Sequence, residues 1–436
     1  MLPPSPRRSA IHPLVALAFI SPLALGGCDT GAARPAVAQG ELAGTAGLAG
    51  TSPVPSASAS PAVSAAATFS YGPDLINARA QHTLTLLDDG RVLVVGGADG
   101  TGTLAESEVY DPLTSTWQRT RDLNPSGSML DATGRFPTAR QLHSATLLPD
   151  GRVLIAGGIG VERLDAEGQP VFEVLRSAYT FDPRTNAFAA APPLPSARAW
   201  QLDAPTATGA VLVGGVDSTL ASTTGVLSFD AARNRWSTST LASTHTWGAL
   251  ATLPGRGALA VGGGDVQQGA NGKLGVASAA ATRSELLDAS GVVSALAPTA
   301  TETIFSAAAP LAGGGAFLSG GQLLAGSQFH VTDTTEVFDG RAWSEGPALL
   351  APRYQHRALA LRSGDVLLVG GVDAQAQPMA ACELYQAKAR RVIPSARLSI
   401  PRVDHRAVQL ASGQVLVVGG FDAQGQAVAQ TELYTP

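Results

Sequence analysis

Short apolar runs that end in a pair of glycines recur along most of this chain of 436 residues. One run reads Val92-Leu93-Val94-Val95 and another reads Val415-Leu416-Val417-Val418, and Gly-Gly follows each directly. A short continuous apolar run bounded by turn residues is typical of a strand that is buried on both faces. The pattern occurs seven times, at Gly96-Gly97, Gly157-Gly158, Gly214-Gly215, Gly262-Gly263, Gly320-Gly321, Gly370-Gly371 and Gly419-Gly420.

The glycine pairs belong to a longer repeat. Their first glycines are 61, 57, 48, 58, 50 and 49 residues apart. After each pair, a polar loop leads to an aromatic residue or leucine, at Tyr110, Phe181, Phe229, Leu287, Phe338, Tyr385 and Tyr434. A further strand-like segment then carries a second aromatic residue in several copies, at Trp117, Phe188, Trp236 and Trp343. A period in this range indicates an array in which each unit buries its faces against its neighbours, so the sequence predicts an all-β fold.

This order of Gly-Gly, aromatic residue and tryptophan resembles the kelch repeat, a four-stranded blade of a β-propeller. The resemblance covers residues 69–436 and implies a seven-bladed kelch-type β-propeller, similar to the central domain of galactose oxidase. Seven copies are informative about fold rather than function, because one fold hosts many unrelated activities.

The two ends of the repeat array complement each other. The last copy stops at Tyr434-Thr435-Pro436 and lacks its tryptophan-bearing strand. Phe69 lies ten residues before Arg79, just as Phe188 lies ten before Arg198. The segment around Phe69 is therefore predicted to be the fourth strand of the last blade, which closes the ring and removes an exposed sheet edge.

The first residues of the chain resemble a secretory signal peptide. Arg7 and Arg8 precede an apolar run over 14–25, which is too short to span a bilayer. Leu25-Gly26-Gly27-Cys28 resembles the bacterial lipoprotein box, which implies a signal peptide over 1–27, cleavage before Cys28 and lipid on its sulfur. Ordinary secretion with an unrelated cysteine is the alternative.

Residues 28–66 are rich in Ala, Gly, Ser and Pro, and this composition predicts a disordered, flexible tether. The expected organisation is a signal peptide over 1–27, a tether over 28–66 and a propeller over 67–436. The expected location is the bacterial envelope, with the propeller facing the periplasm or the cell surface and held to the membrane through the lipid anchor.

Composition narrows the classes of function. Charged residues make up 14% of the chain, and 29 Lys and Arg stand against 34 Asp and Glu. This balance argues against a nucleic-acid binder, which needs a basic footprint. Two cysteines, Cys28 and Cys382, exclude a disulfide framework and a cysteine-rich zinc module.

Four copies open with the motif Arg-x-x-His, at Arg79/His82, Arg140/His143, Arg353/His356 and Arg402/His405. A position that recurs in a repeat usually serves the repeat, so the arginine and histidine of this motif are predicted to hold adjacent blades together through hydrogen bonds. The glycine pairs are predicted to allow the close approach of the blades near the axis. In the other three copies the third position of this segment is aromatic, at Trp200, Trp247 and Phe305.

Alternation along a strand would place the first and third positions on the same side. The central mouth would then have a cationic arc of Arg79, Arg140, Arg353 and Arg402 opposite an aromatic arc of Trp200, Trp247 and Phe305. Such a mouth would bind a ligand with an anionic end and a flat or sugar-like face. The alternative is that the aromatic residues only wedge between blades.

Loop lengths point to one face of the ring. From the second glycine to the next aromatic residue or leucine, the spacing is 13 or 14 in four copies, but 23, 24 and 17 in copies two, four and five. The long connection over 121–139 extends the same face. Insertions gathered on one face of a repeat array usually mark its binding face, whereas tolerated insertions would scatter.

Two carboxylates also recur. Aspartate follows Gly-Gly at Asp99, Asp217, Asp265, Asp373 and Asp422, where it could hold calcium but more readily caps the loop. Glutamate precedes the aromatic residue by two at Glu108, Glu285, Glu336, Glu383 and Glu432, and is predicted to be a structural partner of backbone or of the opening arginine.

No sequence signature of catalysis is present. The galactose oxidase family uses an adjacent Tyr-His and a Cys–Tyr crosslink, whereas this chain has Tyr354-Gln-His356, and Cys382 is predicted to be a buried thiol. The sequence therefore predicts no catalytic residue, no metal site and no cofactor. It favours a monomeric binding module for a carbohydrate or protein partner over the alternative, a carbohydrate-active propeller enzyme of the galactose oxidase or sugar epimerase kind.

Overall fold

The structure is a computed structural model that describes residues 67–120, 139–164, 170–268, 274–278, 283–288, 291–325 and 328–436. The predicted signal peptide, the lipidation site Cys28 and the tether lie outside these residues. The described part of the chain contains strands and no helix, which confirms the all-β class. Within it, no helix has the length and apolar character needed to cross a membrane.

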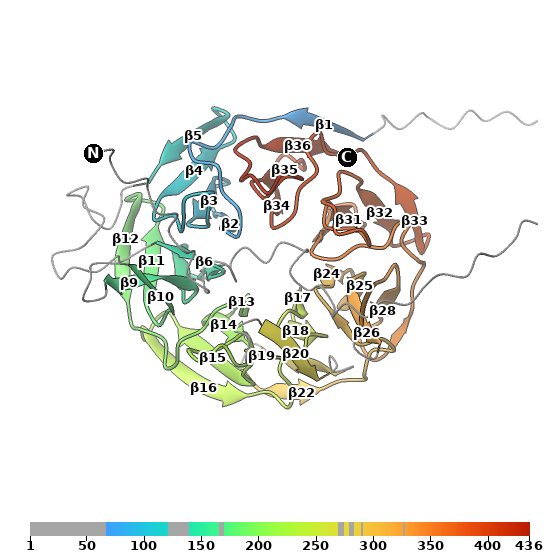
Figure 1. The fold of residues 1–436 in the computed structure, drawn as a ribbon, viewed down its shortest axis with the longest axis horizontal. Helices are drawn as coiled ribbons and strands as arrows, with labels where there is room; N and C mark the ends of the chain where they lie inside the picture. The colour runs from blue at the N-terminus through green and yellow to red at the C-terminus, as the bar shows by residue number, and fades with distance from the viewer. Residues whose placement is uncertain are drawn as a thin grey trace, which may run out of the picture.

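Seven four-stranded antiparallel sheets form the body of the described chain. Figure 1 shows them arranged around a common centre, with one edge strand of each sheet nearest that centre. These inner strands are β2 (Thr83–Leu86), β7 (Ser144–Leu147), β13 (Leu202–Thr206), β17 (Ala249–Leu253), β24 (Ala307–Leu311), β30 (Arg357–Ala360) and β34 (Arg406–Gln409).

The second strand of each sheet is the apolar run that precedes Gly-Gly. These strands are buried almost throughout, as the continuous apolar pattern predicts. They are β3 (Val92–Val95), β8 (Val153–Ala156), β14 (Gly209–Val213), β18 (Gly257–Val261), β25 (Gly315–Ser319), β31 (Val366–Val369) and β35 (Val415–Val418).

The third and fourth strands complete each sheet toward the rim. The third strands are β4 (Ser107–Asp111), β11 (Ala178–Asp182), β15 (Gly225–Asp230), β21 (Ser284–Leu287), β28 (Thr335–Phe338), β32 (Glu383–Gln386) and β36 (Glu432–Thr435). The fourth strands are β5 (Thr116–Arg119), β12 (Ala187–Ala191), β16 (Arg235–Thr240), β22 (Val293–Ala295), β29 (Trp343–Glu345), β33 (Arg391–Pro394) and β1 (Thr68–Tyr71).

The N-terminal strand β1 is the outer strand of the sheet that ends the chain. It pairs antiparallel with β36 and places Phe69 opposite Tyr434. Their ring centroids are 5.2 Å apart. The segment around Phe69 is thus the fourth strand of this sheet, as predicted. Figure 1 shows β1 on the rim, next to β36.

Adjacent sheets are joined by the second glycine of the Gly-Gly pair. At six junctions in the described chain, its N–H donates to the carbonyl of the residue that opens the next repeat; Gly97 N, for example, donates to Arg140 O at 2.8 Å. Gly97 has a φ of +100°. A Cβ here would lie 2.5 Å from Ala80 O, so the contact requires glycine.

Eight further strands lie outside the seven sheets. They form two small three-stranded sheets and one hairpin. They are β6 (Arg140–Gln141), β9 (Ile159–Leu164), β10 (Pro170–Val174), β19 (Asp265–Gln268), β20 (Leu274–Ser278), β23 (Thr303–Ile304), β26 (Gln322–Ala325) and β27 (Gln328–Val331). The β9–β10, β19–β20 and β26–β27 hairpins are the long loops of copies two, four and five.

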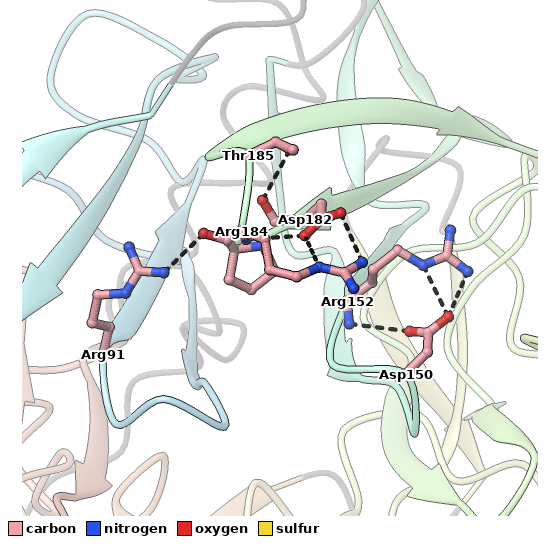
Figure 2. A network of polar contacts seen from close by, with 7 residues as sticks. Arg91, Asp150, Arg152, Asp182, Arg184 and Thr185 are labelled. Atoms are coloured by element: carbon pink, nitrogen blue, oxygen red, sulfur yellow. Dashed lines mark hydrogen bonds and ion pairs between the residues drawn. The ribbon is translucent and has the colours of Figure 1, made fainter.

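Local ion pairs hold the turn between β7 and β8 and the turn between β11 and β12 (Figure 2). Arg152 pairs with Asp150 at 2.7 Å, and Arg184 pairs with Asp182 at 3.0 Å. Arg91 donates to the carbonyl of Pro183 at 2.8 Å and so links the first two sheets. Exposed ion pairs of this kind contribute little to stability, so the buried contacts near the glycine pairs matter more for the ring.

Candidate functional site

The four arginines of the Arg-x-x-His motif are buried between sheets and do not line the centre of the ring. Their side chains are among the largest that are fully buried: Arg79, Arg140, Arg353 and Arg402. Arg402 donates from Nη1 to Gly419 O and Gln430 O, both at 3.0 Å, and pairs with Glu432 at 2.7 Å. The expectation that these four arginines form a cationic arc at the mouth is therefore wrong.

The recurring glutamates are the partners of these arginines and of nearby backbone. Arg79 pairs with Glu108 and Arg353 with Glu383. Glu108 also accepts hydrogen bonds from two consecutive N–H groups, those of Ile76 at 2.8 Å and Asn77 at 3.0 Å. This confirms the predicted structural role of the glutamate.

Four repeats depart from this pairing: copies two and three have Tyr179 and Leu227 in place of the glutamate, and copies four and five have His245 and Thr303 in place of the arginine. In copy two Tyr179 occupies the glutamate position, and the guanidinium of Arg140 lies 4.9 Å from the centroid of its ring. In copy four His245 replaces the arginine, and its Nε2 lies 3.1 Å from Glu285. Copies two and four thus keep a buried contact at this position with other residues, whereas Thr303 Oγ1 of copy five is buried without a hydrogen-bond partner in the described chain.

The motif histidines lie at the junctions between sheets. His143 Nε2 is 2.9 Å from Thr83 Oγ1 of the preceding sheet, and His356 Nε2 is 2.8 Å from Ser319 Oγ of the preceding sheet. His82 and His405 have no hydrogen-bond partner for either ring nitrogen within the described residues. Burial lowers the pKa of all four well below the ordinary value, so they are neutral at neutral pH.

The third position of each opening segment lies in the left-handed backbone region, and this explains the misplaced arginines. The seven residues have φ values between 53° and 59° and are Gln81, Leu142, Trp200, Trp247, Phe305, Gln355 and Asp404. The inner strands begin only after this position, so strand alternation does not relate it to the arginine two residues earlier. The arginine is buried, whereas the third side chain reaches the centre.

Backbone hydrogen bonds link these third positions from repeat to repeat. Leu142 N donates to Gln81 O at 3.1 Å, and Trp200 N donates to Leu142 O at 3.0 Å. Further links run from Gln81 N to Asp404 O, from Phe305 N to Trp247 O and from Gln355 N to Phe305 O. One residue from each repeat is thereby held around the centre of the ring.

These seven residues line a pocket of about 190 Å³, together with the first residues of several inner strands. We call it the axial pocket, because every repeat contributes to its wall. A water molecule needs about 10–15 Å³ of such space, so the axial pocket has room for a ligand of monosaccharide size.

One half of the axial pocket is aromatic. Trp200, Trp247 and Phe305 come from three consecutive repeats, and the rings of Trp247 and Phe305 stack with centroids 4.8 Å apart. Trp247 is only 6% exposed, whereas Trp200 and Phe305 are partly buried. The structure thus brings together the predicted aromatic arc, with Trp247 also serving as a core residue.

The other half is polar and charged. Gln355, Asp404 and Gln81 come from the next three repeats around the ring, and Gln81 Nε2 donates to Asp404 Oδ2 at 3.1 Å. Arg357 and Arg406, the first residues of β30 and β34, line the same half. The cationic groups at the centre are therefore these two arginines.

Sequence reasoning missed Arg357 and Arg406. The signal was present, because an arginine directly follows the Arg-x-x-His motif in copies six and seven alone. The other repeats have Thr83, Ser144, Leu202, Ala249 and Ala307 at this position. The arginines that occur in only two repeats line the pocket, whereas the arginine that recurs in the motif does not.

Burial shifts the pKa values of Asp404 and Arg357, two charged residues of the polar half. Burial raises the pKa of Asp404 above its ordinary value, although the hydrogen bond from Gln81 and the charge of Arg357 act the other way. Burial lowers the pKa of Arg357, and the charge of Asp404 opposes this. A guanidinium remains charged in proteins, so both arginines are cations in the pocket.

The three insertion hairpins gather at the aromatic half. Phe172 of β10, Val276 of β20 and Phe329 of β27 pack against one apolar cluster. The same cluster contains Trp247 and contacts Trp200 and Phe305. The long loops of copies two, four and five therefore converge on one end of the ring, as their lengths predicted; the connection over 121–138 lies outside the described residues.

Four of the five aspartates after Gly-Gly cap their own loops, whereas Asp265 begins β19 and accepts a hydrogen bond from Thr244 Oγ1 at 2.7 Å. Asp373 Oδ1 accepts from the N–H groups of Gln375 and Gln377, both at 2.9 Å, and Asp422 Oδ1 accepts in the same way from Gln424 and Gln426. This geometry is that of an Asx turn. It favours the predicted loop-capping role over a calcium site.

Comparison with known proteins supports the propeller. No family model matches the chain. Beta-scruin from Limulus polyphemus is 30% identical over 169 residues, which make up 37% of this chain and 16% of beta-scruin. Among solved structures, YjhT superposes with a TM-score of 0.54 over 74% of this chain and 99% of its own, at 15% identity. The fold is a kelch-like β-propeller. A fungal alcohol oxidase of the AA5 family, solved with copper, also superposes, with a TM-score of 0.57, over 84% of this chain and 75% of its own, at 15% identity.

The residues of this propeller do not fit a copper site. Within the described ranges, no group of three or more His, Cys, Asp or Glu side chains could hold a metal ion. Both histidines of the axial pocket, His143 and His356, already contact hydroxyl groups. Cys382 is buried, and burial raises the pKa of its thiol to about 11.

Proposed function

We propose that the protein is a lipid-anchored, monomeric binding module of the bacterial envelope, anchored through Cys28. Its seven-bladed kelch propeller, closed by the N-terminal strand, binds a carbohydrate in the axial pocket. The observation that supports this most strongly is the composition of the pocket wall, with aromatic side chains on one half and hydrogen-bonding side chains on the other. Sugars have apolar ring faces and polar edges, and such a wall can bind both.

Three residues that line the pocket carry a buried polar atom without a hydrogen-bond partner in the described chain. These atoms are Trp247 Nε1, Ser306 Oγ and Gln201 Oε1. Buried polar groups in proteins nearly always have a partner. These three atoms are closed off from the pocket by their neighbours, so a ligand hydroxyl would reach them only after those side chains shift.

Asp404 favours one second candidate, a carbohydrate-active propeller enzyme of the sugar epimerase kind. Its buried carboxyl has a raised pKa and lines the pocket, as expected of an acid–base residue. Acid–base chemistry on a sugar generally needs a second proton-transferring group, and among the described residues of the pocket wall Asp404 is the one carboxylate. A binding role therefore agrees better with the described side chains.

Substitution of Trp200 by leucine tests the proposed function. Leu142 occupies the same repeat position with nearly the same φ, so leucine is compatible with the backbone there. We expect sugar binding on a glycan array, followed by calorimetry, to weaken at least about tenfold, because stacking area in the pocket is lost.

The matched control is Trp236→Leu. Trp236 lies on the outer strand β16, where it packs against Phe229. It should change stability and leave the affinity of the folded protein intact. If no glycan binds, if Trp200→Leu leaves affinity unchanged, or if glycan is turned over to a new product, the binding proposal is wrong.

A further inference from the structure

The two arginines that line the axial pocket, Arg357 and Arg406, are not part of the repeat pattern. Arg357 and Arg406 follow the motif histidine in two neighbouring repeats, whereas the other five repeats have small or apolar residues there. Both begin inner strands and reach the polar half of the pocket. Because the fold of the other repeats forms without these arginines, their place on one side of the ring indicates that this side binds a ligand group of its own.

The two guanidinium groups converge on a single oxygen atom. Arg357 Nε donates to His405 O at 3.0 Å, and Arg406 Nη1 donates to the same oxygen at 3.4 Å. The other N–H groups of both side chains have no partner in the part of the chain that the structure describes, and neither forms an ion pair there. Two cations are thus held side by side with most of their donors free.

The pocket has a net positive charge. Arg357 and Arg406 contribute two positive charges and Asp404 one negative charge, which leaves a net charge of +1 on the wall; its histidines are neutral. Like charges repel each other more strongly away from bulk water. A singly charged anion between the two guanidinium groups would relieve this repulsion.

We propose that the ligand of the axial pocket is an acidic sugar unit, such as a uronic acid, whose carboxylate is bound by Arg357 and Arg406. This inference rests on the proposed carbohydrate-binding function and makes it specific. The planar guanidinium fork matches the two oxygens of a carboxylate. Asp404 Oδ1, which has no hydrogen-bond partner in the described chain, accepts a sugar hydroxyl, and the ring packs on Trp200 and Phe305.

The test is calorimetric binding of galacturonate and galactose to the full-length protein. These sugars differ only in a carboxylate or a CH2OH group at one carbon. We expect galacturonate, or its isomer glucuronate, to bind at least about tenfold more tightly than the neutral sugar of the same configuration. Arg357→Thr should remove most of that difference, and Arg406→Thr should do the same. Threonine is chosen because the first repeat has Thr83 at the equivalent position.

Arg362→Thr is the control, because Arg362 lies in the turn between β30 and β31, is exposed and contacts the loop at Ala411. It should leave both affinities unchanged. Equal binding of acidic and neutral sugars, or Arg357→Thr and Arg406→Thr variants that keep the full preference, would overturn the acidic-ligand inference and leave the carbohydrate proposal standing. Failure of galacturonate, galactose, glucuronate and glucose alike to bind at millimolar concentration would overturn both.

Discussion

Replacing Arg402 by methionine is expected to lower the free energy of unfolding by about 3–5 kcal/mol, because it leaves Glu432 as an unpaired buried charge. The guanidinium of Arg402 is fully buried and pairs with Glu432 at 2.7 Å. Burial lowers the pKa of Arg402, and the charge of Glu432 acts against this shift. Equilibrium unfolding in urea, followed by tryptophan fluorescence, measures the change.

Arg397→Met is the matched control. Arg397 is exposed and lies in the connection between β33 and Arg402, so its replacement should change stability by less than about 0.5 kcal/mol. An Arg402→Met protein as stable as the Arg397→Met protein would contradict the structural role. In that case Arg402 would again be a candidate ligand-binding residue.

Replacing Gly419 by alanine is expected to cost about 2–5 kcal/mol, the sum of left-handed backbone strain and overpacking. Gly419 has a φ of +62°, and its new Cβ would lie 2.3 Å from Arg79 O and 2.6 Å from His82 Cε1. These contacts belong to the junction between the last repeat and the first. The same unfolding measurement reports the cost of disturbing ring closure.

Gly425→Ala separates the two contributions. Gly425 has a φ of +72° but nothing within 4 Å of the new Cβ, so it should lose only the strain of about 1–2 kcal/mol. Equal losses for the two variants would show that the last and first repeats do not pack closely at Gly419.

The repeat pattern contained most of the information about the fold. Apolar runs before Gly-Gly predicted the buried second strands, and the spacing before Arg79 predicted the place of Phe69 beside Tyr434. These features could be predicted because they depend on contacts that every repeat makes. Loop lengths predicted where the hairpins gather for the same reason.

The candidate site was predicted only in part. Trp200, Trp247 and Phe305 reach the axial pocket, but the arginines chosen with them are buried. The error arose from assuming an extended strand through Gln81, Leu142 and their equivalents, where the backbone has a positive φ. Residues such as leucine and tryptophan seldom adopt this conformation, so their identity gave no warning.

The most direct test of the account is a crystal structure of the protein with galacturonate. The account predicts the sugar in the axial pocket, with its carboxylate within hydrogen-bond distance of Arg357 and Arg406 and its ring against Trp200. Galacturonate found on the rim of the propeller, or at the centre with its carboxylate turned toward Trp247, would contradict it.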